Sequence, residues 1–162
     1  MAVKGTYVYE WPRPMVTVDA AVFSFSNGKA RLLLINRKHD PYQGHWAIPG
    51  GFIEMDEELE DAVARELAEE TGLTGIALEQ MRTFGTVGRD PRGRQITVVF
   101  LGIAGPGQTE ICAGDDAAEA RWFAIDALPP RMAFDHEHVA QIAIDRLREM
   151  KPYHDAIDAA PA

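Results

Sequence analysis

The chain has 162 residues, of which 46% are hydrophobic and 25% are charged, and its net charge is −9. This length predicts one domain over residues 1–152, and the composition argues against fibrous and disordered classes. The acidic balance argues against nucleic-acid binding, because that affinity comes from clustered basic side chains. No apolar run reaches membrane-spanning length, and Cys112, the single cysteine, allows no internal disulfide and is expected to be inert. We therefore expect a cytoplasmic protein without membrane partners.

Apolar and β-branched runs predict the strands. An extra N-terminal strand is expected within residues 1–13, before the buried strand predicted for MVTVDAAVFSF (15–25). The dipeptide Asn27-Gly28 then predicts a hairpin turn, because both residues tolerate positive φ. The return strand and three later strands are expected at 30–37, 78–86, 95–104 and 120–125.

Helical spacing predicts two helices. The first begins near Glu57, and Gly72 is placed to end it with a left-handed cap. The second runs from Asp135, a candidate N-cap, to Met150, and we interpret His136 as part of this cap in preference to a ligand contact. Residues 153–162 are expected to form a flexible tail. The order of elements predicts an α/β or α+β domain in which helices pack on a mixed sheet.

The first helix places acidic residues on the face that should be apolar. At about 100° per residue, Glu66 and Glu70 fall in the middle of the apolar stripe, and Glu69 lies at its edge. Burying an unpaired carboxylate costs several kcal/mol, and Arg65 is the only basic residue of this helix. A divalent cation such as Mg²⁺ would supply the missing charge. The alternative is a helix whose last turn is solvated at the edge of a cleft.

The spacing around this helix is more specific. It matches the Nudix box, a pattern of fixed positions in which U is an aliphatic residue. The matching residues are Gly51, then Glu57 after five residues, then REUxEExGU from Arg65 to Leu73 after seven more. The chain therefore resembles a Nudix hydrolase. The resemblance implies a mixed β-sheet sandwiched between α-helices, and cleavage of a nucleoside diphosphate linked to another moiety with Mg²⁺ or Mn²⁺.

The resemblance also assigns roles by position. It implies that Glu66 and Glu70 bind the metal, that Glu69 contributes directly or through water, and that the Gly51 carbonyl completes the shell. Arg65 would hold the glutamates in place, and Glu57 would pair within the same loop-helix-loop unit.

The resemblance also implies a general base from an acidic loop late in the chain, and the matching stretch here is AGDDAAEARWF (113–123). The candidates are Asp115, Asp116 and Glu119, with Glu119 ranked first because it adjoins the strand that ends in Trp122-Phe123. The alternative for this stretch is an ordinary polar hairpin.

Outside the box, RPMVTVDAAVFSF, RTFGTVGRDPRGR and FDHEHV look most like the ADP-ribose pyrophosphatase branch of the family. That branch includes Nudix domains fused to nicotinamide-mononucleotide adenylyltransferase and those of Nudix-related regulators. The candidate substrate contacts, for phosphate, ribose or base, are Arg37, Trp46, Arg89, Arg92 and Arg94. The alternatives are a solvated turn for the loop arginines and a core position for Trp46.

The expected reaction is hydrolysis of ADP-ribose to AMP and ribose 5-phosphate. Two alternatives remain open: a hydrolase of oxidised nucleotides or dinucleotides, and a non-catalytic module that senses ADP-ribose or NAD. The expected partner is a small nucleotide, with no nucleic acid, and fold-level analogy suggests a homodimer.

Overall fold

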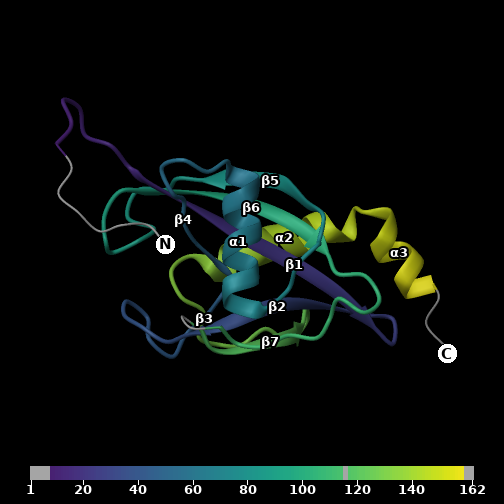
Figure 1. Ribbon diagram of the computed structural model, residues 1–162. Helices are drawn as coiled ribbons and strands as arrows, with labels where there is room; N and C mark the ends of the chain where they lie inside the picture. The colour runs from purple at the N-terminus through teal and green to yellow at the C-terminus, as the bar shows by residue number, and fades with distance from the viewer. Residues whose placement is uncertain (1–7, 115–116, 159–162) are drawn as a thin grey trace.

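The strands of this computed structural model, which describes residues 8–114 and 117–158, belong to one mixed sheet (Figure 1). The path through the sheet is β3-β2-β1-β6-β5, with β4 beside β1 and β7 beside β2. The strands are β1 (Met15–Ser26), β2 (Lys29–Arg37), β3 (Trp46–Ala47), β4 (Gly50–Phe52), β5 (Leu78–Phe84), β6 (Gln95–Ile103) and β7 (Ala117–Ala124). The predicted mixed sheet is therefore confirmed.

β1 is the central strand because it pairs on both sides. It returns into β2 through the predicted hairpin, where Asn27 and Gly28 have φ of 50° and 69°. On its other side it runs parallel to β6 over nine residue pairs, from Met15↔Gln95 to Phe23↔Ile103. Side chains alternate along β1, so that Val18 faces one apolar core and Phe23 the other.

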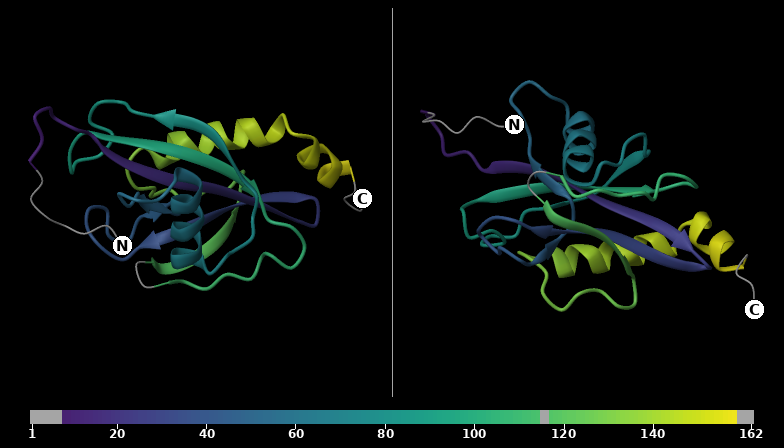
Figure 2. Two further views of the ribbon diagram at one scale, coloured as in Figure 1. Left: turned by 45° about the horizontal axis from the view of Figure 1, so that its top comes forward. Right: turned by 60° about the horizontal axis from the view of Figure 1, so that its bottom comes forward.

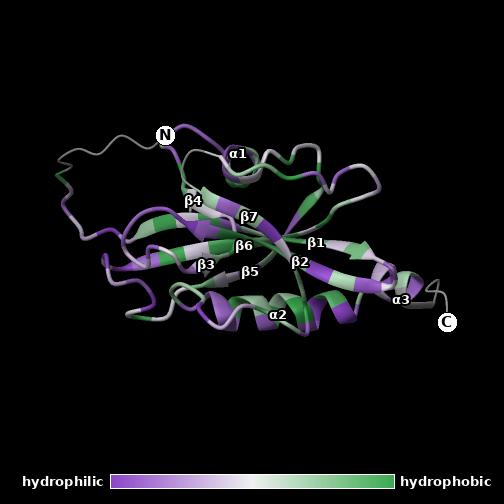
Figure 3. Ribbon diagram, turned by 90° about the horizontal axis from the view of Figure 1, so that it is seen from below, coloured by the Kyte–Doolittle hydropathy of each residue, from purple (hydrophilic) through white to green (hydrophobic). Residues whose placement is uncertain are grey.

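Two helices cover opposite faces of the sheet (Figures 2 and 3). The helix α1 (Leu59–Thr71) packs on the core that contains Val18, and α2 (His136–Arg148) packs on the core that contains Phe23. Gly72 ends α1 with φ of 74° and donates its N–H to the Ala68 carbonyl, which is the left-handed cap that the sequence predicted. The arrangement is a sheet between helices.

Two local predictions concern the ends of the chain. An N-terminal strand was expected within residues 1–13, but residues 1–7 are not described and residues 8–14 form no strand. A flexible tail was expected over residues 153–162. Residues 153–158 are helical, as part of α3 (Lys151–Asp158), where Tyr153 packs against Phe25 with ring centroids 6.5 Å apart, and residues 159–162 lie outside the described residues. The short strands β3 and β4 were not predicted, because two or three residues carry too little pattern to indicate a strand.

Among the helices of residues 8–114 and 117–158, none is long and apolar enough to cross a membrane.

Candidate active site

A cavity of about 310 Å³ opens where the last turns of α1, the strand β4, the 85–94 loop and the start of α2 meet. Its wall contains carboxylates, guanidinium groups, two imidazoles and two phenyl rings. The charged and aromatic lining residues are Asp19, Arg37, Lys38, His39, Asp40, Phe52, Arg65, Glu66, Glu69, Glu70, Arg89, Asp90, Arg92, Phe134 and His136. The cavity therefore gathers residues from across the whole chain.

The helix α1 presents two of its three predicted carboxylates inward. Glu70 is 8% exposed, and its Oε2 accepts a hydrogen bond from the Gly50 N–H at 2.9 Å. The Glu66 side chain is 14% exposed and that of Glu69 is 53% exposed, in the order expected from the helical positions. Burial raises the pKa of Glu70 to about 8, and burial also raises the pKa of Glu66. The positive charge near these two carboxylates therefore does not offset their burial.

Arg65 offsets only part of this burial, because its guanidinium is shared among several partners. Its Nε and Nη2 donate to the two oxygens of Glu57 at 3.0 and 2.7 Å, and Nη2 also donates to the Phe52 carbonyl at 3.1 Å. Its Nη1 donates to Glu66 at 2.8 Å and to Glu69 at 3.4 Å. These hydrogen bonds lower the pKa of Glu57 and raise that of Arg65. Arg65 thus links the loop before α1, through Phe52 and Glu57, to the glutamates of the helix.

Gly51 brings the backbone against the Glu66 carboxylate. A Cβ at this position would lie 2.5 Å from the Glu66 carboxylate atoms, so only glycine fits without displacing them. The donors here are all oxygens, which suits a hard cation such as Mg²⁺ or Mn²⁺. No three acidic or imidazole side chains converge closely enough to hold an ion by themselves within the described ranges. An ion at this site would therefore rely on backbone, water and substrate oxygens as well.

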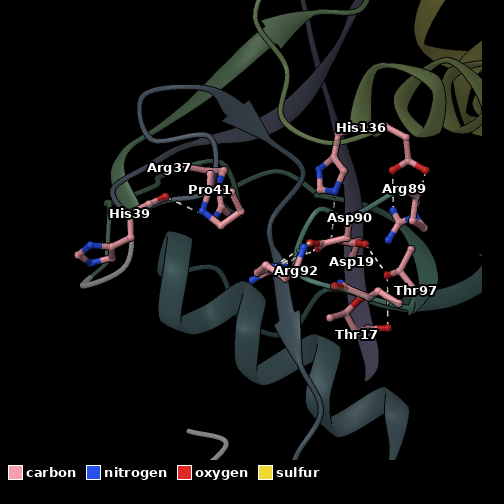
Figure 4. Close-up of polar contacts among 12 residues, drawn as sticks. Thr17, Asp19, Arg37, His39, Pro41, Arg89, Asp90, Arg92, Thr97 and His136 are labelled. Atoms are coloured by element: carbon pink, nitrogen blue, oxygen red, sulfur yellow. Dashed lines mark hydrogen bonds and ion pairs between the residues drawn. The ribbon is translucent and has the colours of Figure 1, made fainter. Parts of the chain in front are cut away.

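Asp19 is a cavity carboxylate that the sequence reasoning missed. It lies on the central strand and is 6% exposed, with its Oδ2 accepting the Thr97 hydroxyl at 2.5 Å (Figure 4). Its Oδ1 lies 3.9 Å from His136 Nε2. The sequence does carry a signal for this residue, because Asp19 is the acidic residue inside a run of otherwise apolar or β-branched residues.

His136 does not serve as a helix cap. Its Nδ1 accepts the Ile48 N–H at 3.0 Å, across 88 residues of sequence, and burial lowers its pKa. Asp135 also makes no capping hydrogen bond with its side chain, because its carboxylate binds Arg89. Asp135 therefore occupies the predicted N-cap position without a side-chain cap, and the His136 side chain contacts Ile48 in place of the cap.

Arg37 and Arg92 form a cationic wall on the ring of Phe134. Their guanidinium carbons lie 4.9 and 5.2 Å from the ring centroid, and Arg92 is also 5.0 Å from that of Phe52. Arg37 donates to the Pro41 and His39 carbonyls, whereas Arg92 pairs with Asp90 at 2.7 Å. Burial, with Arg92 nearby, lowers the pKa of Arg37.

The arginines of the 85–94 loop have separate partners. The Arg89 side chain is 3% exposed and binds Asp135 with two hydrogen bonds of 3.0 and 2.6 Å, which joins the loop to the start of α2. Arg94 donates to the Gly85 carbonyl and does not line the cavity. Of the loop arginines, Arg89 and Arg92 reach the cavity.

Other predicted site residues lie elsewhere. Trp46 packs beside Phe123 in the α2-side core, with ring centroids 4.7 Å apart, and it does not line the cavity. Glu119 lies within β7, outside the cavity wall, and its carboxylate pairs with Arg121. Asp115 and Asp116 are outside the described residues. The identity of a general base stays a prediction.

Comparisons with known proteins agree with this geometry. The NUDIX domain family model matches residues 15–141. An ADP-ribose pyrophosphatase of Methanocaldococcus jannaschii is 42% identical over 127 residues, covering 78% of this chain and 70% of the relative. The ADPR-responsive transcriptional repressor NtrR of Acinetobacter baylyi is 36% identical over 149 residues, and the alignment spans 89% of this chain but only 58% of the repressor.

A solved structure extends the comparison. The NUDIX domain of Shewanella oneidensis NrtR, crystallised with ADP ribose, matches with a TM-score of 0.76 and 30% identity. The match covers 85% of this chain and 90% of that domain.

Proposed function

The chain belongs to the Nudix hydrolase family, and we propose that its reaction is the hydrolysis of ADP-ribose to AMP and ribose 5-phosphate with a divalent cation. The observation that supports this most directly is that carboxylates and guanidinium groups line the same cavity. Glu66 and Glu70 line it together with Arg37 and Arg92. A metal-bound pyrophosphate needs both kinds of group, because its oxygens bind cations and guanidinium groups alike.

The residues proposed to hold the cation are Glu66, Glu70, the Gly51 carbonyl and, directly or through water, Glu69. Mg²⁺ or Mn²⁺, when bound, would neutralise phosphate charge and lower the pKa of a coordinated water. The protein keeps the carboxylates in place before binding: the Gly50 N–H fixes Glu70, and Arg65 fixes Glu66. Fixed ligands reduce the reorganisation needed when the substrate arrives.

Arg37 and Arg92 are proposed to orient the substrate. Both guanidinium groups already lie over the Phe134 ring, so they lose little conformational freedom when they bind phosphate or ribose oxygens. Arg89 has a positioning role instead, because its ion pair with Asp135 fixes the loop that carries Arg92. The relative that is an ADP-ribose pyrophosphatase and the domain crystallised with ADP ribose support this choice of substrate.

The test is a product assay on purified protein. ADP-ribose should yield AMP and ribose 5-phosphate with Mg²⁺ or Mn²⁺, and EDTA should stop the reaction. NADH, diadenosine polyphosphates and 8-oxo-dGTP are the matched alternatives, and a larger kcat/KM for one of them would replace ADP-ribose as the substrate.

The similarity to a repressor that responds to ADPR gives a second candidate, a sensor of the same ligand. A sensor would bind ADP-ribose tightly in a calorimeter and release no AMP over hours with either metal. A homodimer and a cytoplasmic location remain predictions, which sedimentation and cell fractionation would check.

A further inference from the structure

Asp19 and His136 form a buried donor-acceptor pair that no metal or arginine role uses. His136 Nδ1 accepts the Ile48 N–H, so the neutral ring carries its proton on Nε2. Burial lowers the pKa of His136, which favours this neutral form. The Nε2 donor therefore faces Asp19 Oδ1 in a fixed tautomer (Figure 4).

The pair is too far apart to satisfy itself. The distance from Nε2 to Oδ1 is 3.9 Å, beyond the range of about 2.7–3.2 Å for an N–H···O hydrogen bond. Both residues line the cavity, and the side chains of His136 and Asp19 are 7% and 9% exposed. One oxygen placed about 2.8 Å from each atom would bridge them, provided that it accepts from Nε2 and donates to Oδ1.

We propose that Asp19 and His136 together bind a sugar hydroxyl of the ligand, an inference that rests on the proposed function. A hydroxyl is both donor and acceptor, which the gap requires. A phosphate oxygen is excluded because Asp19 would repel it, and an ammonium group is excluded because it cannot accept from Nε2. The Thr97 hydroxyl holds the other oxygen of Asp19, so the carboxylate is oriented before the ligand binds.

The position of the pair favours a ribose over a purine. Gly50 pairs with Asp19 in the sheet and donates its N–H to Glu70, so the pair lies next to the proposed metal ligands. Ribose hydroxyls are a few bonds from the pyrophosphate, whereas the base is farther away. The strand side of the wall is also small and polar, with Thr17, Gln95 and Gly50. The flat apolar surface near the pair is the Phe134 ring, 5.4 Å from the His136 ring, and Arg37 and Arg92 already lie over it.

Two substitutions remove one half of the pair each. In Asp19→Asn the amide oxygen can still accept from the Thr97 hydroxyl, but the amide NH2 places a second donor at the gap, opposite His136 Nε2. In His136→Asn the amide oxygen can replace Nδ1 as acceptor for Ile48, while the Nε2 donor is lost. Ser24→Ala is the matched control, since Ser24 is a fully buried polar residue on the same strand but does not line the cavity.

The experiment measures kcat/KM for ADP-ribose and for analogues that each lack one ribose hydroxyl. With the native protein, one analogue should lose about ten- to a hundredfold, in keeping with a hydrogen bond to a charged group. With Asp19→Asn or His136→Asn, that analogue and ADP-ribose should react at nearly equal rates. Ser24→Ala should behave as the native protein does, and thermal melting checks that every variant folds.

Three outcomes would overturn the inference. In the first, the variants lose the same factor in kcat/KM for ADP-ribose and for every deoxy analogue. In the second, the variants match the native protein because the gap holds only water. In the third, the loss of kcat/KM in the variants disappears when IDP-ribose is the substrate, which would indicate that the pair contacts an edge of the base. Each differs from a failure of the proposed function, in which the native protein would release no AMP from ADP-ribose. Calorimetry with α,β-methylene-ADP-ribose and its deoxy forms repeats the comparison without catalysis.

Discussion

The two helices that cover the sheet have the same length, 13 residues, but they bury different chemistry. α2 turns Val139, Ala143 and Leu147 onto its core, and the buried polar side chain it contributes is His136 at its first turn. α1 turns Val63 and Leu67 inward but adds Glu66 and Glu70 to the same face. An inward carboxylate destabilises a fold unless something binds it, so the difference separates a helix used for packing from one used for chemistry.

The largest effect is expected at the inward carboxylate of α1. Glu70→Gln should lower kcat by about 10³-fold or more, because a lost metal ligand removes several kcal/mol of transition-state stabilisation. The amide oxygen can still accept from Gly50, so the melting temperature without metal should not fall. AMP release and calorimetry measure the two quantities, and near-normal turnover would refute the metal role of Glu70.

The opposite result is expected in α2. Leu147 is fully buried, so Leu147→Ala should lower the free energy of unfolding by about 2–5 kcal/mol through lost burial and the cavity left behind. Urea denaturation measures this loss. At a temperature where the variant remains folded, kcat should stay within about twofold of the native value, on the view that this position is remote from the cavity. A tenfold fall in kcat would show that α2 also affects the chemistry.

A smaller effect is expected at Arg65, which positions the glutamates of α1. Arg65→Lys keeps the charge but cannot make the paired contact with Glu57. We expect metal affinity to weaken by about 10–100-fold, as for other residues that orient metal ligands. A titration of activity with Mg²⁺ would show a raised midpoint with partial recovery at high metal. A lower kcat with no change in that midpoint would contradict this positioning role.

The smallest effect is expected on the outer face of α1. Glu60 is exposed, so Glu60→Gln should change the free energy of unfolding by less than about 0.5 kcal/mol and leave kcat/KM unchanged. This variant is the charge-matched control for Glu70→Gln. If it also abolished activity, net charge rather than position would explain the result.

Local patterns determined much of the fold and of the acidic part of the cavity wall. The apolar, β-branched run at 15–25, the Asn27-Gly28 turn and the Gly72 cap each depend on neighbouring residues, and the structure has the expected strand, turn and cap. The inward direction of Glu66 and Glu70 follows from the helical repeat alone. These features were predictable because their causes lie within a few residues of chain.

The other walls of the cavity depend on contacts between distant segments. Sequence spacing does not reveal that Arg89 binds Asp135, 46 residues away, or that His136 accepts from Ile48. The same holds for α3, which forms where Tyr153 reaches Phe25. The sequence by itself determined the sheet, the two main helices and a cluster of acids in need of a cation. Only the tertiary structure decided which arginines share the cavity with that cluster and that Asp19 and His136 lie beside it, because the free energy of those contacts comes from burial that no local pattern records.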